Sequence, residues 1–244
     1  METMVRFEGV TKEFSPGNYG VLDLNFEVKK GEMVAIVGKT GCGKSTAFGL
    51  LVGLTKPTSG TITVDGCDPF RDFDQFRGKI GIVFQNDRLL PWRTAVENAS
   101  VGLEIMGIEE KQRRDIALEW LQRLGLSGWE DKYPHELSGG MRQRVAIARA
   151  FTMDPSLILC DESFSALDEL TATRLRKEFM SLVKENGKTG LFITHSINEA
   201  IEMANRILIF HKPGHVGREI HVPEQLDVHE NENLRQEILN SLGA

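Results

Sequence analysis

A chain of 244 residues can form one large domain or two closely joined ones, with enough buried surface for a substantial core. Its formal net charge of -6 argues against a protein that coats nucleic acid, because such proteins usually present a basic face. No segment approaches the roughly 20 apolar residues that a membrane helix needs, so we expect any association with a membrane to be through a partner protein.

Two kinds of strand follow one another along the chain. The first 35 or so residues alternate between apolar and polar, and the pattern predicts a half-exposed antiparallel strand with Leu22, Leu24, Phe26 and Val28 on one face. Residues 61–64 alternate in the same way. Later runs are continuously apolar, which is typical of parallel strands covered on both faces; they span residues 34–37, 157–160, 191–194 and 207–210.

Helical patterns separate the apolar runs. Residues 85–154 carry only such patterns, with one apolar face formed by Ile116, Trp120, Leu121 and Leu124. Another helix is predicted to begin near Asp168, because Leu175, Phe179 and Leu182 are spaced four and three apart. The last predicted elements are a short strand at 219–222 and a helix at about 234–242. The whole pattern indicates an α/β fold with an inserted helical lobe.

A glycine-rich loop, Gly38–Ser45, follows the buried run at 34–37 and leads into a predicted helix. It fits the pattern G-x-x-x-x-G-K-[ST] of a phosphate-binding loop. Glycines let the backbone wrap around phosphates, Lys44 can reach the β- and γ-phosphates, and the Ser45 hydroxyl can bind Mg²⁺. An ordinary glycine-rich turn is the alternative, but the strand–loop–helix context favours the phosphate loop.

A second glycine-rich segment, Leu137–Arg144, also opens a predicted helix about a hundred residues later. The first turn of a helix has free N–H groups and the positive end of the helix dipole, so it can bind an anion. One triphosphate needs only one cradle. The pair therefore suggests a nucleotide clamped between two surfaces.

Two carboxylates, Asp161 and Glu162, stand at the carboxyl end of the run at 157–160, where α/β sheets place ligands. Asp161 can hold Mg²⁺ through water, and Glu162 can orient and deprotonate an attacking water. A solvated acidic turn is the alternative, and it becomes less attractive beside a phosphate loop.

The order of these motifs resembles the ATPase subunit of ABC transporters over nearly the whole chain. The matching set is Gly38–Ser45, Gln85, Leu137–Gly140, Asp161–Glu162, Ser165–Asp168 and His195. The resemblance implies a P-loop NTPase core with a mainly parallel sheet, an N-terminal antiparallel β subdomain and an inserted α-helical subdomain. The implied division is a core of residues 1–84 and 156–222, a helical subdomain of 85–155 and a short helical tail of 223–244.

The resemblance also implies a head-to-tail dimer with ATP and Mg²⁺ between two subunits, either identical or different. Glu162, Lys44, Gln85 and His195 would be catalytic, and Ser45, Gln85 and Asp161 would hold the metal. Asp168 would pass information across the dimer. For Gln85 and His195 the alternative is a solvated or structural role, which is more common for a single Gln or His. The implied ATP-binding residues are Phe14, Gly38, Lys39, Thr40, Gly41, Cys42, Gly43, Lys44, Ser45, Thr46, Ser138, Gly139, Gly140 and Asp168.

The adenine contact is predicted at Phe14, because the family stacks the base on an aromatic residue early in the chain. Tyr19 is the rival, and a core position is the ordinary alternative for an early Phe. Many relatives carry Tyr at this place, so Phe14 would keep the stacking face and lose a hydroxyl.

A membrane partner is predicted at Leu89, Leu90, Pro91 and Trp92, an apolar cluster on a loop. In the family this region receives a short helix of the permease, whereas the alternative is that Trp92 anchors the helical lobe. Residues 84–93 are similar to the branch that imports nitrate, sulfonate, taurine and related anions. This resemblance implies a peripheral protein on the cytoplasmic face of the membrane. It also implies an indirect link to a solute-binding protein and no nucleic-acid partner.

Other functions remain open at this point. They are a different ABC transport system such as an exporter or lipid transporter, an ABC ATPase acting on nucleic acid or the ribosome, and a small-molecule phosphotransferase. The chain also departs from the family at Cys160, where a larger apolar residue is usual, and at Ser163, where proline often stands. The three cysteines lack metal-ligand spacing and indicate reduced thiols of a cytosolic protein.

Overall fold

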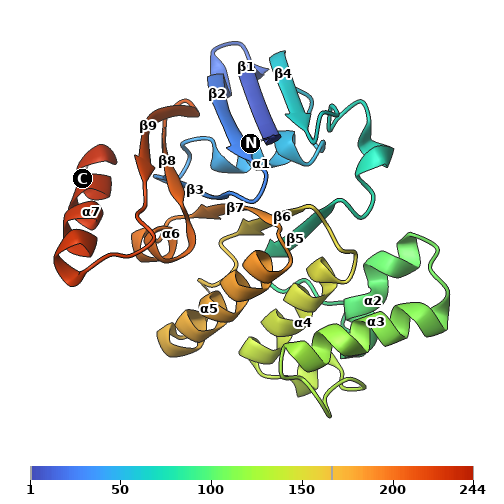
Figure 1. The fold of residues 1–244 in the computed structure, drawn as a ribbon. Helices are drawn as coiled ribbons and strands as arrows, with labels where there is room; N and C mark the ends of the chain where they lie inside the picture. The colour runs from blue at the N-terminus through green and yellow to red at the C-terminus, as the bar shows by residue number, and fades with distance from the viewer. Residues whose placement is uncertain (1, 166, 244) are drawn as a thin grey trace. The chain divides into compact units, whose positions relative to one another are not determined.

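The computed structural model describes residues 2–165 and 167–243. Ala166, within the predicted Ser165–Asp168 motif, lies outside the described residues. The chain divides into two compact units, Met1–Phe76 with Thr189–Ala244, and Arg77–Lys188. Figure 1 shows the elements of both. The predicted helical subdomain, 85–155, falls within the second unit.

The first unit begins with an antiparallel sheet of three strands. They are β1 (Thr3–Ser15), β2 (Asn18–Lys29) and β4 (Ser59–Val64), in the order β2-β1-β4. Figure 1 shows the three side by side. Alternate side chains of β4 are buried, as predicted for residues 61–64. The rings of Phe7 and Phe26 stack across β1 and β2 with centroids 4.6 Å apart.

The predicted face of β2 is wrong at one position. Leu24, Phe26 and Val28 are buried, but Leu22 is exposed and Val21 is buried in its place. Asp23 has a φ of 47°, and the pairing of β1 with β2 shifts register in this stretch. A bulge adds one residue to the strand, so every side chain before it changes face.

The same unit contains four strands of a second sheet, in the order β7-β3-β8-β9. The strands β3 (Met33–Gly38), β7 (Thr189–Thr194) and β8 (Arg206–His211) are parallel, and β9 (His215–His221) is antiparallel to β8. All three parallel strands are buried almost throughout, which confirms the prediction from their continuous apolar runs. The predicted strand at 219–222 overlaps the end of β9, which begins earlier and stops at His221.

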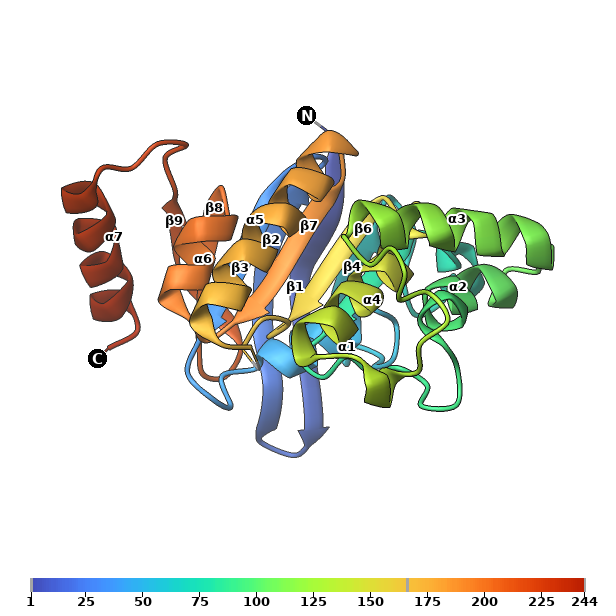
Figure 2. The same ribbon diagram turned by 90° about the horizontal axis from the view of Figure 1, so that it is seen from below.

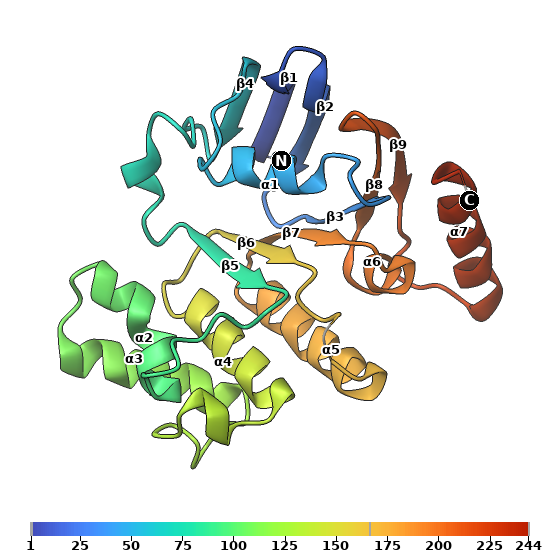
Figure 3. The ribbon, with the colours of Figure 1, turned by 180° about the vertical axis from the view of Figure 1, so that it is seen from behind.

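Three α-helices belong to the described part of this unit: α1 (Lys44–Leu51), α6 (Ile197–Met203) and α7 (Val228–Ser241). A 3₁₀ turn, η1 (Phe73–Phe76), precedes its boundary. Helix α6 packs on β3 and β7, and α7 packs on β9 and α6. Figure 3 shows α7 beside β9. The predicted last helix is confirmed, although it begins earlier than expected.

The second unit pairs two parallel strands with four helices. The strands are β5 (Ile80–Phe84) and β6 (Leu157–Asp161). The helices are α2 (Ala95–Ile105), α3 (Glu110–Arg123), α4 (Gly139–Phe151) and α5 (Glu169–Glu185), with a 3₁₀ turn η2 (Pro134–Glu136). Figure 2 shows α2, α3 and α4 gathered together. Only helices lie between the two strands, as the sequence predicts.

Aromatic side chains form the core of the second unit. Phe151 of α4 contacts Trp120 of α3 and Phe179 of α5, with ring centroids 5.1 Å and 5.8 Å apart. Leu175, Phe179 and Leu182 are buried, which confirms the predicted apolar stripe of α5. Among residues 2–165 and 167–243, no helix combines the length and apolar character needed to cross a membrane.

Candidate nucleotide-binding site

The phosphate loop connects β3 to α1, as predicted. Gly41 and Gly43 have φ values of 75° and 110°, in the region that favours glycine, and Gly43 caps α1. A Cβ on Gly38 would lie 2.5 Å from the sulfur of Cys42 and 2.7 Å from the carbonyl oxygen of Phe210. The glycines are therefore required by backbone shape and by close packing, which is the geometry that a phosphate cradle needs.

Lys44 places its ammonium group inside this loop. The side chain is buried, and Nζ donates hydrogen bonds to the carbonyl oxygens of Gly38 at 2.5 Å and Lys39 at 3.3 Å. These oxygens offset the cost of burying a positive charge. An anion brought to the loop would meet a cation that is already dehydrated, so their attraction would be stronger than in water.

Phe14 stands near the loop on an exposed surface. Its ring is 60% exposed, and the ammonium of Lys12 lies 5.4 Å from its centroid. A Cβ on Gly20 would approach both the ring of Phe14, at 2.6 Å, and the side chain of Thr46, at 2.7 Å. Phe14 is therefore not a core residue, and it shares one small region with the first turn of α1. The rival, Tyr19, is half-buried.

His195 and the loop follow neighbouring parallel strands. Val37 pairs with Thr194, so Gly38 and His195 come next at the same edge of the sheet. The side chains of His195 and Ser45 are exposed. Lys39 is directed elsewhere, because its Nζ donates to the carbonyl oxygen of Gly243 at 2.9 Å, beyond the end of α7. In this structure the second residue of the loop holds the C-terminal segment.

Gln85, Asp161 and Glu162 meet at one edge of the second unit. Phe84 pairs with Asp161 in parallel register, so Gln85 and Glu162 are the next residues of the two strands. Ser165 joins them: Nε2 of Gln85 donates to its hydroxyl at 3.2 Å, and that hydroxyl donates to the carbonyl oxygen of Glu162 at 2.9 Å. Glu162 has a φ of 49°, an uncommon conformation for a non-glycine residue and one that often marks functional sites.

Ser163 and Gln143 hold this edge together, and sequence reasoning gave neither of them that role. The hydroxyl of Ser163 donates to the carbonyl oxygen of Val83 at 2.6 Å, which ties the segment after β6 to β5. Nε2 of Gln143 donates to the carbonyl oxygens of Ser163 at 2.7 Å and Phe84 at 3.3 Å. Ser163, described from sequence as a departure from the family, thus forms a buried hydrogen bond that proline lacks. A polar residue on an otherwise apolar helix face was the available signal for Gln143.

The second glycine-rich segment begins α4 as predicted. Ser138 caps the helix, and its hydroxyl accepts from the N–H of Met141 at 3.3 Å. Gly139 is exposed and Gly140 is half-buried, and a Cβ on Gly140 would lie only 3.1 Å from a side-chain carbon of Thr171, which is a tight contact. The N-terminal end of α4 therefore has the geometry of an anion-binding helix end.

Helix α4 also holds the loop that contains Gln85. Arg142 donates to a carboxylate oxygen of Asp87 at 3.0 Å and to the carbonyl oxygen of Leu137 at 2.8 Å. Arg149 donates to the carbonyl oxygens of Asp87 at 2.6 Å and Arg88 at 2.8 Å, and burial lowers its pKa. The second glycine-rich segment and the Gln85 loop are thus joined by hydrogen bonds within one unit.

Asp168 has a clear local role. It caps α5, and a carboxylate oxygen accepts from the N–H of Thr171 at 3.0 Å. Hydrogen bonds from the backbone N–H and the hydroxyl of Thr171 lower the pKa of Asp168. Its predicted role across a dimer stays a prediction.

The predicted docking cluster needs one correction. Leu89 is only 8% exposed and belongs to the core of the unit, so it cannot form part of an exposed surface. Leu90 is half-buried, whereas Pro91 is exposed and Trp92 is 70% exposed. The loop turns inward at Leu89, whose N–H donates to Asp87, and outward again at Pro91.

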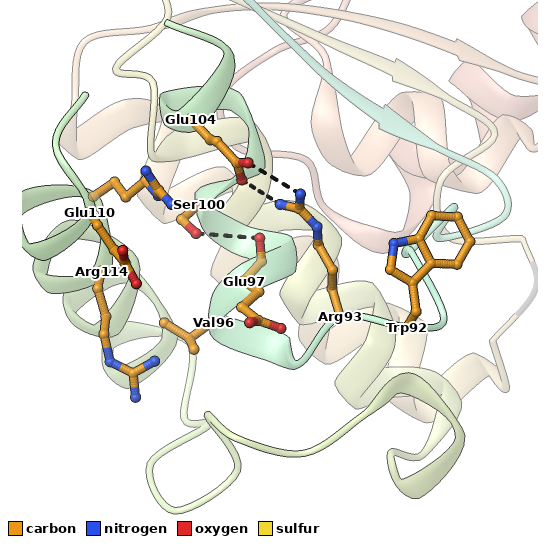
Figure 4. Close-up of a pocket in the computed structure, with 9 residues that line it drawn as sticks. Trp92, Arg93, Val96, Glu97, Ser100, Glu104, Glu110 and Arg114 are labelled. Carbon is orange, nitrogen blue, oxygen red and sulfur yellow. Dashed lines mark hydrogen bonds and ion pairs between the residues drawn. The ribbon is translucent and has the colours of Figure 1, made fainter. Parts of the chain in front are cut away.

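A cavity of about 430 Å³ lies beside Trp92, within the second unit. Figure 4 shows Trp92 at one side of it and Arg93 and Glu104 forming an ion pair. Hydrogen bonding to Arg93 lowers the pKa of Glu104, so the pair stays charged at neutral pH. Its lining residues are Trp92, Arg93, Val96, Glu97, Ser100, Glu104, Glu110, Arg113 and Arg114.

Asn98 fixes the shape of the loop at 90–94, and sequence reasoning missed it. Its side chain is fully buried. The Oδ1 atom accepts from the N–H of Leu90 at 2.7 Å, and Nδ2 donates to the carbonyl oxygens of Leu90, Arg93 and Thr94 at 2.9–3.1 Å. One amide group therefore bonds four backbone groups, two of which, the carbonyl oxygens of Leu90 and Thr94, also accept a backbone N–H. An Asn four residues after a helix cap was the available signal.

The structure thus groups the predicted residues into two sets. The first unit holds Phe14, Gly38–Thr46 and His195, and the second holds Gln85, Ser138–Gly140, Asp161, Glu162 and Asp168. Hydroxyl, amide and carboxylate oxygens, the predicted metal donors, are the ligands that Mg²⁺ prefers. Of the three predicted donors, Ser45, Gln85 and Asp161, only Asp161 is a carboxylate. Among the described residues, no group of three or more His, Cys, Asp or Glu side chains is placed to hold a metal ion.

The sequence profile of the ABC transporter family matches residues 21–165, more than half of the chain. The chain belongs to the ABC transporter family. This ABC protein is 40% identical to the taurine import ATP-binding protein TauB of Yersinia pestis, over 86% of the chain and 80% of TauB. It is also 40% identical to the aliphatic sulfonates import ATP-binding protein SsuB of Bacillus thuringiensis, over 88% of the chain and 85% of SsuB.

Solved structures of ATP-binding cassettes have the same fold as this ABC protein. The cassette MJ0796, solved as a dimer in a post-hydrolysis state with ADP and Pi, is 36% identical, with a TM-score of 0.79 over 91% of this chain and all of that one. The cassette cbiO1 of Clostridium perfringens, part of the transporter complex cbiONQ, is 30% identical, with a TM-score of 0.82 over 91% and 89% of the two chains. The predicted α/β P-loop fold and the ATPase class are thereby confirmed.

Proposed function

We propose that this ATPase powers the uptake of a small anion, of the nitrate, sulfonate or taurine type, through a membrane permease. The observation that carries the proposal is that the chain has both a preformed phosphate loop around Lys44 and a second glycine-rich segment at the start of α4. Hydrogen bonds from Arg142 and Arg149 of α4 to Asp87 connect this helix to the Gln85 loop. The names of TauB and SsuB support import of organic sulfonates. Such a subunit would lie on the cytoplasmic face of the membrane.

The loop Gly38–Thr46 would bind the phosphates of ATP, with Phe14 stacked on adenine. Ser45, Asp161 and Gln85 would hold Mg²⁺, which would offset the negative charge of the β- and γ-phosphates. Glu162 would accept a proton from the attacking water, and His195 would contact the γ-phosphate. Lys44 would stabilise the charge that develops on the phosphate oxygens.

A second copy, or a related subunit, would cover the bound nucleotide with its own Ser138, Gly139 and Gly140. The N–H groups at the start of α4 would contact the γ-phosphate from the opposite side. Cleavage would remove that contact and let the subunits separate. Arg142 and Arg149 would carry the change to the Gln85 loop and on to Trp92. A solute-binding protein would take part only through the permease.

The test of this cycle is ATP-dependent dimer formation. Glu162→Gln removes the proposed base and keeps the shape of the side chain, so we expect the variant with Mg-ATP to form a stable dimer, measured by light scattering after size exclusion. The double variant Glu162→Gln/Lys44→Ala is the control, and it should stay monomeric. A Glu162→Gln protein that remains monomeric at saturating Mg-ATP, alone and with its permease, would contradict the proposal.

The permease is proposed to dock at Pro91, Trp92 and the cavity beside them. An exposed indole next to a cavity fits a short apolar segment of a partner. We expect Trp92→Ala to abolish co-purification with the permease. Trp129→Ala is the matched control, because Trp129 is another exposed tryptophan of the same unit. Equal recovery of the permease with both variants would rule out this surface.

A further inference from the structure

Three glycines from separate segments meet at the end of the phosphate loop. Gly20 belongs to β2, Gly43 ends the loop, and Gly214 lies in the turn between β8 and β9. A Cβ on Gly43 would lie 2.4 Å from the carbonyl oxygen of Gly20 and 2.8 Å from the Cα of Gly214. Real Cβ atoms do not approach other atoms so closely, so the three backbones are in direct contact.

Gly214 is packed as closely in this contact as Gly43. A Cβ on Gly214 would lie 2.5 Å from the carbonyl oxygen of Gly20 and 2.7 Å from the Cα of Val21. These neighbours are backbone atoms of a strand and cannot rotate away. The N–H of Gly214 donates to the carbonyl oxygen of His211 at 2.7 Å, which fixes the turn that carries it.

Gly20 connects this contact to both ends of the proposed nucleotide site. Its carbonyl oxygen faces Gly43 and Gly214, and its missing side chain makes room for Phe14 and Thr46. Gly43 immediately precedes Lys44 and accepts, through its carbonyl oxygen, the N–H of Ala47 at 2.9 Å. The position of Gly43 therefore sets where Lys44 and α1 begin.

We propose that Gly20 and Gly214 are positioning residues for ATP binding, which set the depth of the phosphate loop by supporting Gly43 from behind. A methyl group at residue 214 would press on the carbonyl oxygen of Gly20 and on Val21, and through Gly20 it would displace Gly43 and Lys44. A methyl group at residue 20 would act on the side of Phe14 and Thr46. The proposal rests on the proposed nucleotide site and adds residues that touch no nucleotide themselves.

The experiment compares Gly214→Ala with Gly17→Ala by calorimetric titration with ATP and with inorganic triphosphate. Gly17 has a φ of 77° and Gly214 one of 73°, but nothing lies within 4 Å of a Cβ at Gly17. Both variants therefore carry the same backbone strain, and only one creates the clash. We expect Gly214→Ala to raise the Kd of both ligands about tenfold, since small displacements of binding groups are costly. Gly17→Ala should leave both unchanged.

Gly20→Ala tests the side of the contact that faces Phe14 and Thr46. Because the three atoms nearest to its methyl group belong to the side chains of Phe14 and Thr46, this variant should fold and should raise the Kd of ATP more than that of inorganic triphosphate. The unfolding midpoint of each variant is measured in parallel, and the loss of affinity should exceed anything that partial unfolding explains. If Gly214→Ala does not fold, Gly20→Ala decides the question.

Two results overturn the inference while leaving the proposed function intact. One is that Gly214→Ala binds both ligands as tightly as Gly17→Ala, and the other is that Gly20→Ala binds ATP like the parent protein. The proposed function fails separately if the parent protein binds ATP no better than Lys44→Ala.

Discussion

At the scale of single residues, exposure separates ligand-facing side chains from structural ones. Phe14 is exposed and lies next to Gly20 and Thr46, whereas Tyr19 is half-buried. An exposed aromatic ring adds little to folding, so its presence at this place favours a binding role. Ser163 is the opposite case, since its hydroxyl is buried and bonded to Val83.

We predict that Phe14→Ala raises the Kd of ATP about 5- to 100-fold, which corresponds to the loss of one base-stacking contact. Phe14→Trp should bind at least as tightly as the parent protein, and neither change should alter the free energy of unfolding by more than about 0.5 kcal/mol. Fluorescence titration with ATP measures the first effect and urea unfolding the second. Tyr19→Ala is the comparison, and a loss of affinity there but not at Phe14 would assign the base to Tyr19.

At the scale of elements, helices α2 and α4 hold the loop at 85–94 by polar contacts. Arg142 and Arg149 of α4 bind its first half, and Asn98 of α2 binds its second half. The loop therefore has a defined shape although it contains little regular structure. A proposed signalling loop needs such a shape, because a loop that adapts freely would not transmit a displacement.

We predict that Asn98→Ala lowers the free energy of unfolding by about 2–4 kcal/mol, because the N–H of Leu90 and the carbonyl oxygen of Arg93 lose their partner in a buried place. The carbonyl oxygens of Leu90 and Thr94 keep the backbone N–H groups of Arg93 and Asn98. Trp92→Ala, at an exposed position of the same loop, should change it by less than about 0.5 kcal/mol. Urea unfolding measures both. Both variants should weaken capture of the permease, and a stable Asn98→Ala protein would show that water replaces the amide.

At the scale of the whole molecule, the residues proposed to act on nucleotide are divided between the two compact units. The first unit supplies the phosphate loop, Phe14 and His195, and the second supplies Gln85, Asp161 and Glu162. A ligand that binds only the folded protein stabilises it by an amount that grows with the logarithm of its free concentration over Kd. Nucleotide should therefore raise the stability of the chain.

We predict that Mg-ATP at about 100 times its Kd adds about 2.7 kcal/mol to stability. For a chain of this size, that raises the Tm by about 5–10 °C. Differential scanning calorimetry of the Glu162→Gln variant measures the shift without turnover. Lys44→Ala should abolish it, and an equal shift in both proteins would mean that the nucleotide binds somewhere other than this loop.

Most of the fold was predictable from sequence, because its signals are local. Continuous apolar runs predicted the buried strands β3, β6, β7 and β8, and a stripe of Leu175, Phe179 and Leu182 predicted α5. Two side chains were misplaced, Leu22 and Leu89. A bulge at Asp23 reverses the face of Leu22, and an inward turn buries Leu89; neither leaves a periodic trace in the sequence.

The sequence by itself determined the family, the phosphate loop and the kinds of side chain that a triphosphate needs, since these depend on short patterns of residues. Only the tertiary structure decided which groups support them. Gly20, Gly43 and Gly214 are far apart in the chain, and so are Gln143, Phe84 and Ser163. The physical reason is that backbone contact and burial depend on how strands and turns pack, and that information is not carried by any one segment.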